Sequence, residues 1–237
     1  MIEIDNTRRR LVAAGTGFAL AGANFSAVLA EEKHVAEKEV TAVEDLMREH
    51  GVIRRAILVY RDIATKLRTK PAGVDLKLLG RTADLFRSFG ENYHEKELEE
   101  THIFPIVRKA GGQASAYVDT LISQHQRSHE LTDYVLAAVA KGGVSATEAE
   151  SLARVLDSVE LMYEHHSARE DTVVFPAWKE ALSTRQLDEM GEKFEEIEHR
   201  QFGKDGFEDA VAQISAIEQA LGVADLERFT APPPAKL

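Results

Sequence analysis

Hydrophobic residues recur at helical spacing along almost the whole chain. The first inward-facing stripe consists of Leu46, Ile53, Ile57, Tyr60 and Ala64. Residues three and four apart lie on one face of a helix, so this stripe predicts a helix over about residues 41–68 with one buried face. No alternating strand pattern and no Asn-Gly hairpin turn is present. The pattern therefore predicts an all-α protein.

Glycines, prolines and capping sequences divide the rest of the chain into further helices. Reciprocal side-chain caps are predicted at the pairs Thr41/Glu44, Ser145/Glu148 and Ser183/Gln186. The predicted helices cover about residues 41–68, 76–105, 114–140, 146–182, 184–201 and 208–221. The first four helices are long and are joined by short links, so these four helices should pack as an up-down-up-down four-helix bundle. The last two are additional C-terminal helices.

The first thirty residues have the pattern of an export signal. Arg8, Arg9 and Arg10 precede an apolar, Ala/Gly-rich run that ends at Ala30. A basic start, an apolar middle and small residues at the end are typical of a secretory signal, and the arginine pair resembles the twin-arginine signal. An amphipathic or disordered arm is the alternative.

We therefore expect a periplasmic protein with no stable membrane insertion after signal removal. Its parts would be the export signal (1–30), a bundle with a C-terminal helical extension (31–222) and an extended tail (223–237).

Charge and cysteine content restrict the chemistry. The 237-residue chain has a net charge of -11, which excludes nucleic acid as a partner because binding it requires a basic face. There are no cysteines, so neither disulfides nor thiolate ligands are available. Any metal must be held by His, Asp and Glu, which favours iron, manganese or zinc.

One segment recurs 71 positions later in the chain (94 to 165). Superposing the two copies pairs His94 with His165, Glu99 with Glu170, Glu100 with Asp171, Thr101 with Thr172, and Phe104-Pro105 with Phe175-Pro176. The dipeptide Glu49-His50 has a similar counterpart in Gln124-His125. Two helical hairpins of similar design would bring four His-bearing helices to one central point. A His and Glu pair presented twice is what a two-metal site in a helical bundle requires.

The spacing of the histidines favours a metal site over isolated surface residues. His125 and His129 are four apart, as are His166 and Glu170, so each pair lies on one face of its helix. Buried imidazoles and carboxylates cost several kcal/mol unless they are paired or metal-bound. The alternative is a set of solvent-facing ion pairs.

The ordered set of motifs resembles the hemerythrin-like, HHE cation-binding family over roughly residues 46–178. The resemblance implies a non-heme di-iron centre, hence two iron ions, inside a four-helix bundle. Glu99 and Glu170 would be its bridging carboxylates. The imidazole ligands that it implies are His50, His94, His125, His129 and His166.

Three departures from the family pattern leave alternatives open. The usual His-x3-Glu of the second helix is displaced, so either His94 or Glu95 could be the ligand, and we favour His94. His165 and His166 compete for one role, and the spacing to Glu170 favours His166. In the fifth helix, His199 could be an additional ligand or a surface residue.

Several functions fit such a centre. Its partners would be metal ions and a small diatomic or peroxide ligand, while the oligomeric state is not predicted. Glu95, Glu100, Asp171 and His199 would crowd the site, which argues against a simple oxygen carrier. We expect a protein that binds or senses oxygen or nitric oxide or handles iron. The alternatives are a di-iron enzyme that oxidises ferrous iron or removes peroxide, and a metal-free helical interaction module.

Overall fold

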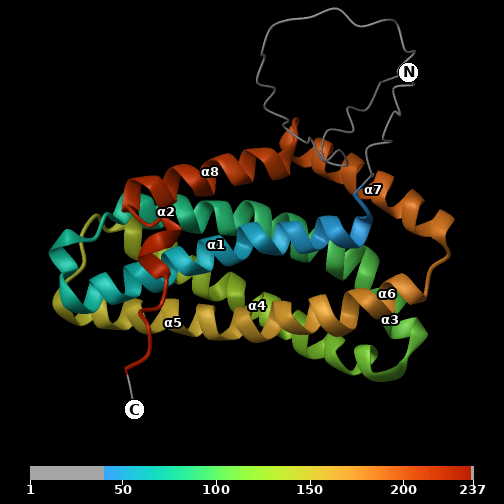
Figure 1. Cartoon of the computed structure of the whole chain (residues 1–237), viewed down its shortest axis with the longest axis horizontal. Helices are drawn as coiled ribbons and strands as arrows, with labels where there is room; N and C mark the ends of the chain where they lie inside the picture. The colour runs from blue at the N-terminus through green and yellow to red at the C-terminus, as the bar shows by residue number, and fades with distance from the viewer. Residues whose placement is uncertain (1–39, 236–237) are drawn as a thin grey trace, which may run out of the picture.

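The computed structural model describes residues 40–235 and forms an all-α, up-down-up-down four-helix bundle (Figure 1). The predicted export signal (1–30) lies outside the described residues. In the described part, the second and fourth bundle helices each consist of three consecutive elements, and a short 3₁₀ helix follows the first. The bundle elements are α1 (Ala42–Thr69), η2 (Pro71–Gly73), α2 (Leu76–Leu85), η3 (Phe86–Ile103), α3 (Phe104–Ala110), α4 (Gly112–Ala140), α5 (Ala146–Arg169), η4 (Glu170–Val174) and α6 (Phe175–Glu180).

The predicted helix starts are confirmed by the capping contacts. Thr41 and Glu44 form a reciprocal capping box at α1, and the pairs at Ser145 and Ser183 do the same for α5 and α7. Such contacts satisfy backbone N–H groups that the first turn of a helix leaves without an acceptor.

The second and fourth bundle helices each contain a wider, π-helical segment, which the sequence analysis did not predict. These segments are η3 and η4, and each ends at a Phe-Pro pair, where an α-helix resumes. At both junctions the Phe N–H donates to the carbonyl five residues earlier: Phe104 to Glu99, and Phe175 to Glu170. Proline lacks an N–H and is tolerated in the first turn of a helix, so both helices continue through Phe-Pro without ending there.

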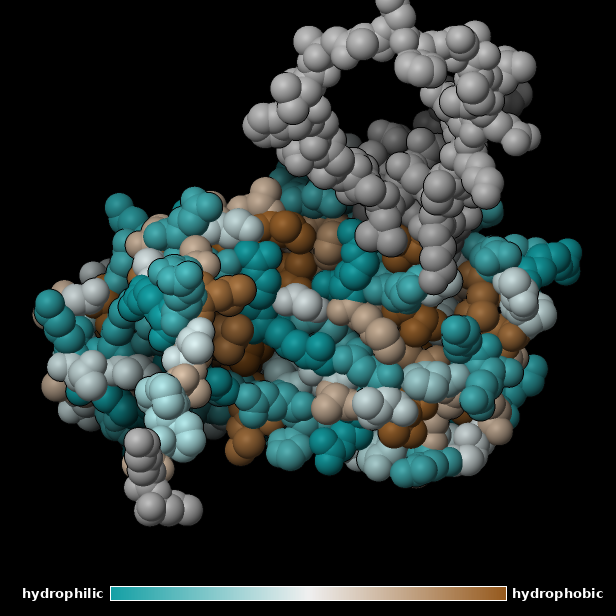
Figure 2. All heavy atoms as spheres, viewed as in Figure 1, coloured by the Kyte–Doolittle hydropathy of each residue, from teal (hydrophilic) through white to brown (hydrophobic). Residues whose placement is uncertain are grey.

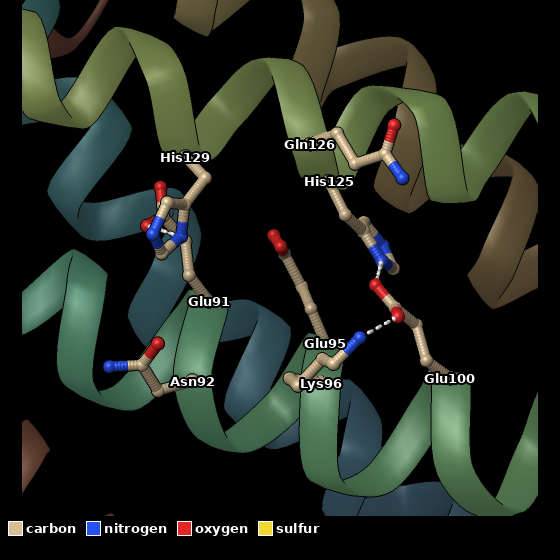
Figure 3. Close-up of a pocket in the computed structure, with 8 residues that line it drawn as sticks. All are labelled: Glu91, Asn92, Glu95, Lys96, Glu100, His125, Gln126 and His129. Carbon is tan, nitrogen blue, oxygen red and sulfur yellow. Dashed lines mark hydrogen bonds and ion pairs between the residues drawn. The ribbon is translucent and has the colours of Figure 1, made fainter.

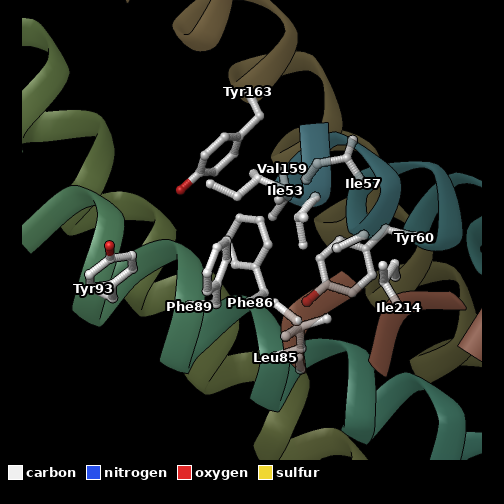
Figure 4. Close-up of a cluster of buried hydrophobic side chains, with 14 of the residues drawn as sticks. Ile53, Ile57, Tyr60, Leu85, Phe86, Phe89, Tyr93, Val159, Tyr163 and Ile214 are labelled. Carbon is white, nitrogen blue, oxygen red and sulfur yellow. The ribbon is translucent and has the colours of Figure 1, made fainter. Parts of the chain in front are cut away.

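The core lies between the four helices and is rich in aromatic side chains. The predicted stripe of α1 is buried, and Phe86 and Phe89 of η3 pack between the tyrosines Tyr60, Tyr93 and Tyr163 (Figure 4). Tyr163 also contacts His166, so this aromatic core packs directly against one histidine-bearing turn.

Two C-terminal helices, α7 (Thr184–Phe202) and α8 (Gly206–Leu221), lie along α1, α2 and η3 (Figure 1). The segment predicted as an extended tail contains a short 3₁₀ helix, η5 (Leu226–Phe229). Hydrophobic side chains gather beside it, where a groove of about 860 Å³ runs along α1 (Figure 2). Within residues 40–235, no helix is both long and apolar enough to span a bilayer.

Replacing the cap of α1 should destabilise the fold measurably. Thr41→Ala removes the acceptor for the Glu44 N–H, which should cost about 1 kcal/mol in urea unfolding of the metal-free protein. Thr65→Ala is the control, because Thr65 is exposed within the same helix and bonds only the Arg61 carbonyl. Equal destabilisation by both variants would contradict the capping role.

Candidate metal centre

Each of the four bundle helices contributes one buried histidine to a common centre. They are His50 from α1, His94 from η3, His125 from α4 and His166 from α5, each at most 4% exposed. Glu99 of η3 and Glu170 of η4 lie among them and are 0% exposed. Six predicted site residues are thus brought together midway along the bundle.

The six residues form two groups that could each hold a metal ion. One contains His50, His94 and Glu99, and the other contains Glu99, His125, His166 and Glu170. Glu99 belongs to both groups: one oxygen lies 3.4 Å from His94 Nε2 and the other 3.3 Å from His125 Nε2.

Glu170 contacts histidines of both halves through a single oxygen. Its Oε2 lies 3.0 Å from His166 Nε2 and 3.4 Å from His50 Nε2. Two shared carboxylates and two imidazoles for each position are therefore available as ligands.

The π-helical pitch of η3 explains why His94, five residues before Glu99, reaches the centre. Hydrogen bonds between residues five apart in a π-helix bring positions i and i+5 to one face, whereas in an α-helix i and i+4 share a face. His166 and Glu170 are four apart because α5 is α-helical up to Arg169.

The matched threonines of the repeat show the same difference in pitch. Thr101 donates to the carbonyl of Lys96, five residues earlier, and Thr172 to that of Ala168, four residues earlier. The structural equivalent of His94 is therefore His166. The superposed His165 is exposed and contacts Arg169.

Every histidine of the centre has an oxygen partner at Nδ1 that directs its Nε2 inward. These partners are Asp171 for His50 (2.7 Å), Glu49 for His94 (2.6 Å), Glu100 for His125 (3.1 Å) and Gln124 for His166 (2.9 Å). Metal-binding histidines commonly use the second ring nitrogen in this way, which fixes the tautomer and the ring orientation.

The two phenylalanines of the Phe-Pro pairs pack on histidines of the opposite hairpin. Phe175 stacks on His50 with ring centroids 5.3 Å apart, and Phe104 stacks on His125 at 5.6 Å. Glu49-His50 and Gln124-His125 therefore occupy equivalent positions, and the two hairpins form a centre with approximate two-fold symmetry.

The electrostatics favour positive charge at His94 and His125 in the metal-free protein. Burial alone would lower the pKa of His94 and of His125. Glu99 and Glu49 instead raise the pKa of His94 well above its ordinary value. The pKa of His125 is raised in the same way by Glu95, Glu100 and Glu99. Burial alone would raise the pKa of Glu170, but His166 and His50 hold it well below its usual range. In the metal-free form, the facing carboxylates therefore favour the protonated forms of His94 and His125.

The donor atoms fit a metal ion. Both carboxylate oxygens of Glu99, both of Glu170 and His94 Nε2 are buried without a hydrogen-bond partner. Leaving such groups unsatisfied is costly, and all of them point into the centre. Imidazole nitrogen and carboxylate oxygen suit iron, manganese or zinc.

Two predicted ligands lie elsewhere. The His129 side chain is 50% exposed, and its Nδ1 lies 3.3 Å from Glu91. Four residues of α-helix span about 6 Å, so His129 lies one turn further along the bundle than His125. His199 is exposed on α7 and belongs to neither group.

The predicted crowding of the centre is also wrong for three of its four residues. Glu100 and Asp171 hold the outer nitrogens of His125 and His50, and His199 is remote. Glu95 is buried beside the centre and accepts a hydrogen bond from the hydroxyl group of Tyr163.

Together, the fold and these side chains define a helical-bundle protein with a histidine–carboxylate metal centre. The chain belongs to the hemerythrin HHE cation-binding domain family, which it matches over residues 41–178. It is therefore a metal-binding protein.

The chain is also 42% identical over 195 residues to two mycobacterial proteins. They are the uncharacterized proteins Rv1995 of Mycobacterium tuberculosis (strain H37Rv) and Mb2018 of Mycobacterium bovis. The alignment covers 82% of this chain and 75% of each relative. No solved structure matches the chain.

The outer partners of the histidines were missed as a set, although the sequence contains a signal for them. Glu49 and Gln124 occupy equivalent places in the two hairpins, as do Glu100 and Asp171. The repeat preserves these polar residues as well as the predicted ligands beside them. This indicates that the polar residues support the ligands. The tilted contact of Tyr163 with His166, at 5.3 Å between centroids, has no such signal.

Removing the partner of His94 should weaken metal binding. Glu49→Leu deletes the acceptor at Nδ1 and should lower metal affinity by about 10–100-fold in competition with a chelator. Glu49→Gln keeps an acceptor, as Gln124 does for His166, and should stay close to the unmodified protein. If Glu49→Leu binds metal as tightly as the unmodified protein, this orienting role is refuted.

Raising the pH should destabilise the metal-free protein more than the loaded one. The raised pKa values of His94 and His125 contribute stability that is present below the ordinary value of 6.5 and is lost as pH rises through the higher folded values. Each 1 kcal/mol lost lowers the Tm of a chain this size by about 2–4 °C. Thermal melts from neutral to alkaline pH should show a falling Tm for the metal-free form. A bound metal ion replaces the protons, so the loaded form should change less. Parallel curves would contradict this assignment.

Proposed function

We propose that this chain is a non-heme di-iron protein that binds or senses a small diatomic ligand, oxygen or nitric oxide. The observation that carries the proposal is the pair of buried carboxylates, Glu99 and Glu170, each facing imidazoles from both hairpins. One iron would be held by His50 and His94 and the other by His125 and His166, with both carboxylates shared. Bound iron would supply reversible ligand binding and one-electron chemistry.

The number of protein donors supports ligand binding. Two imidazoles and two shared carboxylates give each ion fewer protein ligands than an octahedral ion accepts. Glu100 and Asp171 do not fill the remaining positions, because they bond the outer nitrogens of His125 and His50. An external ligand can therefore complete the coordination.

Enzymatic oxidation of ferrous iron or removal of peroxide is the second candidate. Glu95 and Tyr163 favour it, because a buried carboxylate bonded to a phenol lies next to the ligands His125 and His166. A phenol hydrogen-bonded to a carboxylate could hold or release a proton beside the centre, and bound iron would supply the redox chemistry. A simple binding protein has no need of this pair.

We also propose that the protein acts in the cell envelope after export by the twin-arginine route. The support is the sequence pattern of Arg8, Arg9 and the apolar run to Ala30. Replacing both arginines by lysine should leave the protein in the cytoplasm in a fractionation experiment, while replacing Arg10 alone should not.

Removing the shared carboxylates should abolish loading with two irons. The combined variant Glu99→Ala and Glu170→Ala deletes the groups common to both positions, so we expect less than one iron per chain by metal analysis. Glu164→Ala is the control, since its side chain is 55% exposed on the same helix as His166. Circular dichroism checks that both variants remain helical. Full iron content in the combined variant would refute the proposal.

The candidate functions differ in their response to oxidants. An absorption spectrum that changes on anaerobic reduction and changes again when oxygen or nitric oxide is added indicates a binding protein. Sustained consumption of peroxide, or of oxygen with ferrous iron, indicates the enzyme. If no metal binds and chelation leaves the Tm unchanged, the chain is a metal-free interaction module.

A further inference from the structure

The metal ligands are so deeply buried that an ion needs a route through the protein to reach them. Of the six, His125 is the most exposed at 4%, and it lines a cleft of about 420 Å³ between η3 and α4. The other residues lining this cleft are Glu91, Asn92, Glu95, Lys96, Glu100, Gln126 and His129 (Figure 3). Nearly all of them carry oxygen or nitrogen atoms able to bind a cation.

Three buried carboxylates lead along η3 from this cleft to the centre. Glu91, Glu95 and Glu99 are spaced four residues apart and are 3%, 2% and 0% exposed. Glu91 lies beside His129, which is half exposed at the outer part of the cleft, and Glu99 is the shared ligand. Glu95 lies between them and points into the cleft (Figure 3).

Glu95 has an oxygen available for a cation. One carboxylate oxygen accepts the hydroxyl hydrogen of Tyr163, and the other has no hydrogen-bond partner among residues 40–235. The side chain is 2% exposed and faces the cleft (Figure 3), so this oxygen can contact a cation that enters the cleft. Glu91, in contrast, accepts hydrogen bonds from Ser128 and Thr132 and an ion pair from Arg87.

The positive charges near the cleft are already engaged. Lys96 lies 2.6 Å from Glu100, and Arg87 pairs with Glu91 and Asp133. The lining therefore contains three carboxylates and one lysine. The lining thus has more carboxylates than ammonium groups, and an excess of acidic groups in a cleft raises the local concentration of cations.

We propose that this cleft is the uptake route for divalent metal ions and that Glu95 passes the ion from the cleft to Glu99. The inference rests on the proposed di-iron function, because it concerns how that centre is filled. Glu95 binds the ion transiently through its free oxygen. The ion then moves one helical turn to the permanent ligands Glu99 and His125, so Glu95 affects the rate of loading and not the final metal content.

The test measures the rate at which the metal-free, folded protein takes up ferrous iron without oxygen. Unbound iron is trapped at successive times by a coloured chelator. Glu95→Gln should load about tenfold more slowly and reach the same final iron content. Gln126→Trp, which narrows the cleft at an exposed position without removing a carboxylate, should also load more slowly. Glu97→Gln is the matched control, because Glu97 lies on η3 outside the cleft, beside Arg200, and should load at the unmodified rate.

Two results would overturn the uptake route. Unmodified loading rates in both Glu95→Gln and Gln126→Trp would exclude the cleft as the path. A lowered final iron content in Glu95→Gln, with normal loading of Gln126→Trp, would make Glu95 a permanent ligand instead. Failure of the di-iron proposal itself looks different, because the unmodified protein would then take up no iron at any time.

Discussion

The bundle is organised around two buried carboxylates, Glu99 and Glu170, that cannot share a closed interior without compensating positive charge. Each is 0% exposed, and the two repel each other electrostatically, so burial and mutual repulsion both oppose their ionised forms. The four surrounding imidazoles meet this demand through their contacts with the carboxylates and as available ligands for a cation. A helical core without that compensation would lose several kcal/mol for each buried charge. The positions of the histidines follow from this requirement.

Approximate two-fold symmetry meets the requirement with one structural unit used twice. In each hairpin, the residue before the first histidine, Glu49 or Gln124, supports the second histidine of the same hairpin. The residue after Glu99 or Glu170 contacts the first histidine of the opposite hairpin, as Asp171 does for His50. These crossed contacts join the hairpins through polar bonds as well as through the apolar core. Each half of the centre is therefore completed by residues of the other half.

The fold class, the helix order and most helix starts could be predicted from the sequence, because capping and apolar stripes are local signals. The six central residues could also be proposed, because the family resemblance implies them, although the repeat as superposed paired His94 with His165 and left the choice of His166 to its spacing from Glu170. The π-helical pitch of η3 could not, because it arises from packing and has no local signature. Without it, the choice between His94 and Glu95 stays open. His129 was misassigned because the i, i+4 spacing shows only that His125 and His129 share a face of one helix. It does not show which of the two lies at the height of the other histidines along the bundle.

The two halves share a ligand pattern but differ in access, and this difference shapes what the centre can do. His50 and His94 are enclosed by α1, η3 and the ring of Phe175, whereas His125 lines the cleft that also contains Glu95. An external ligand coming through that cleft reaches the His125 side first. Tyr163 and Glu95 lie on this same side, next to His166. The cleft, the Glu95 carboxylate and the Tyr163 phenol thus lie at one of two otherwise similar positions. The chemistry of the centre should therefore be asymmetric even though its histidines and glutamates are paired.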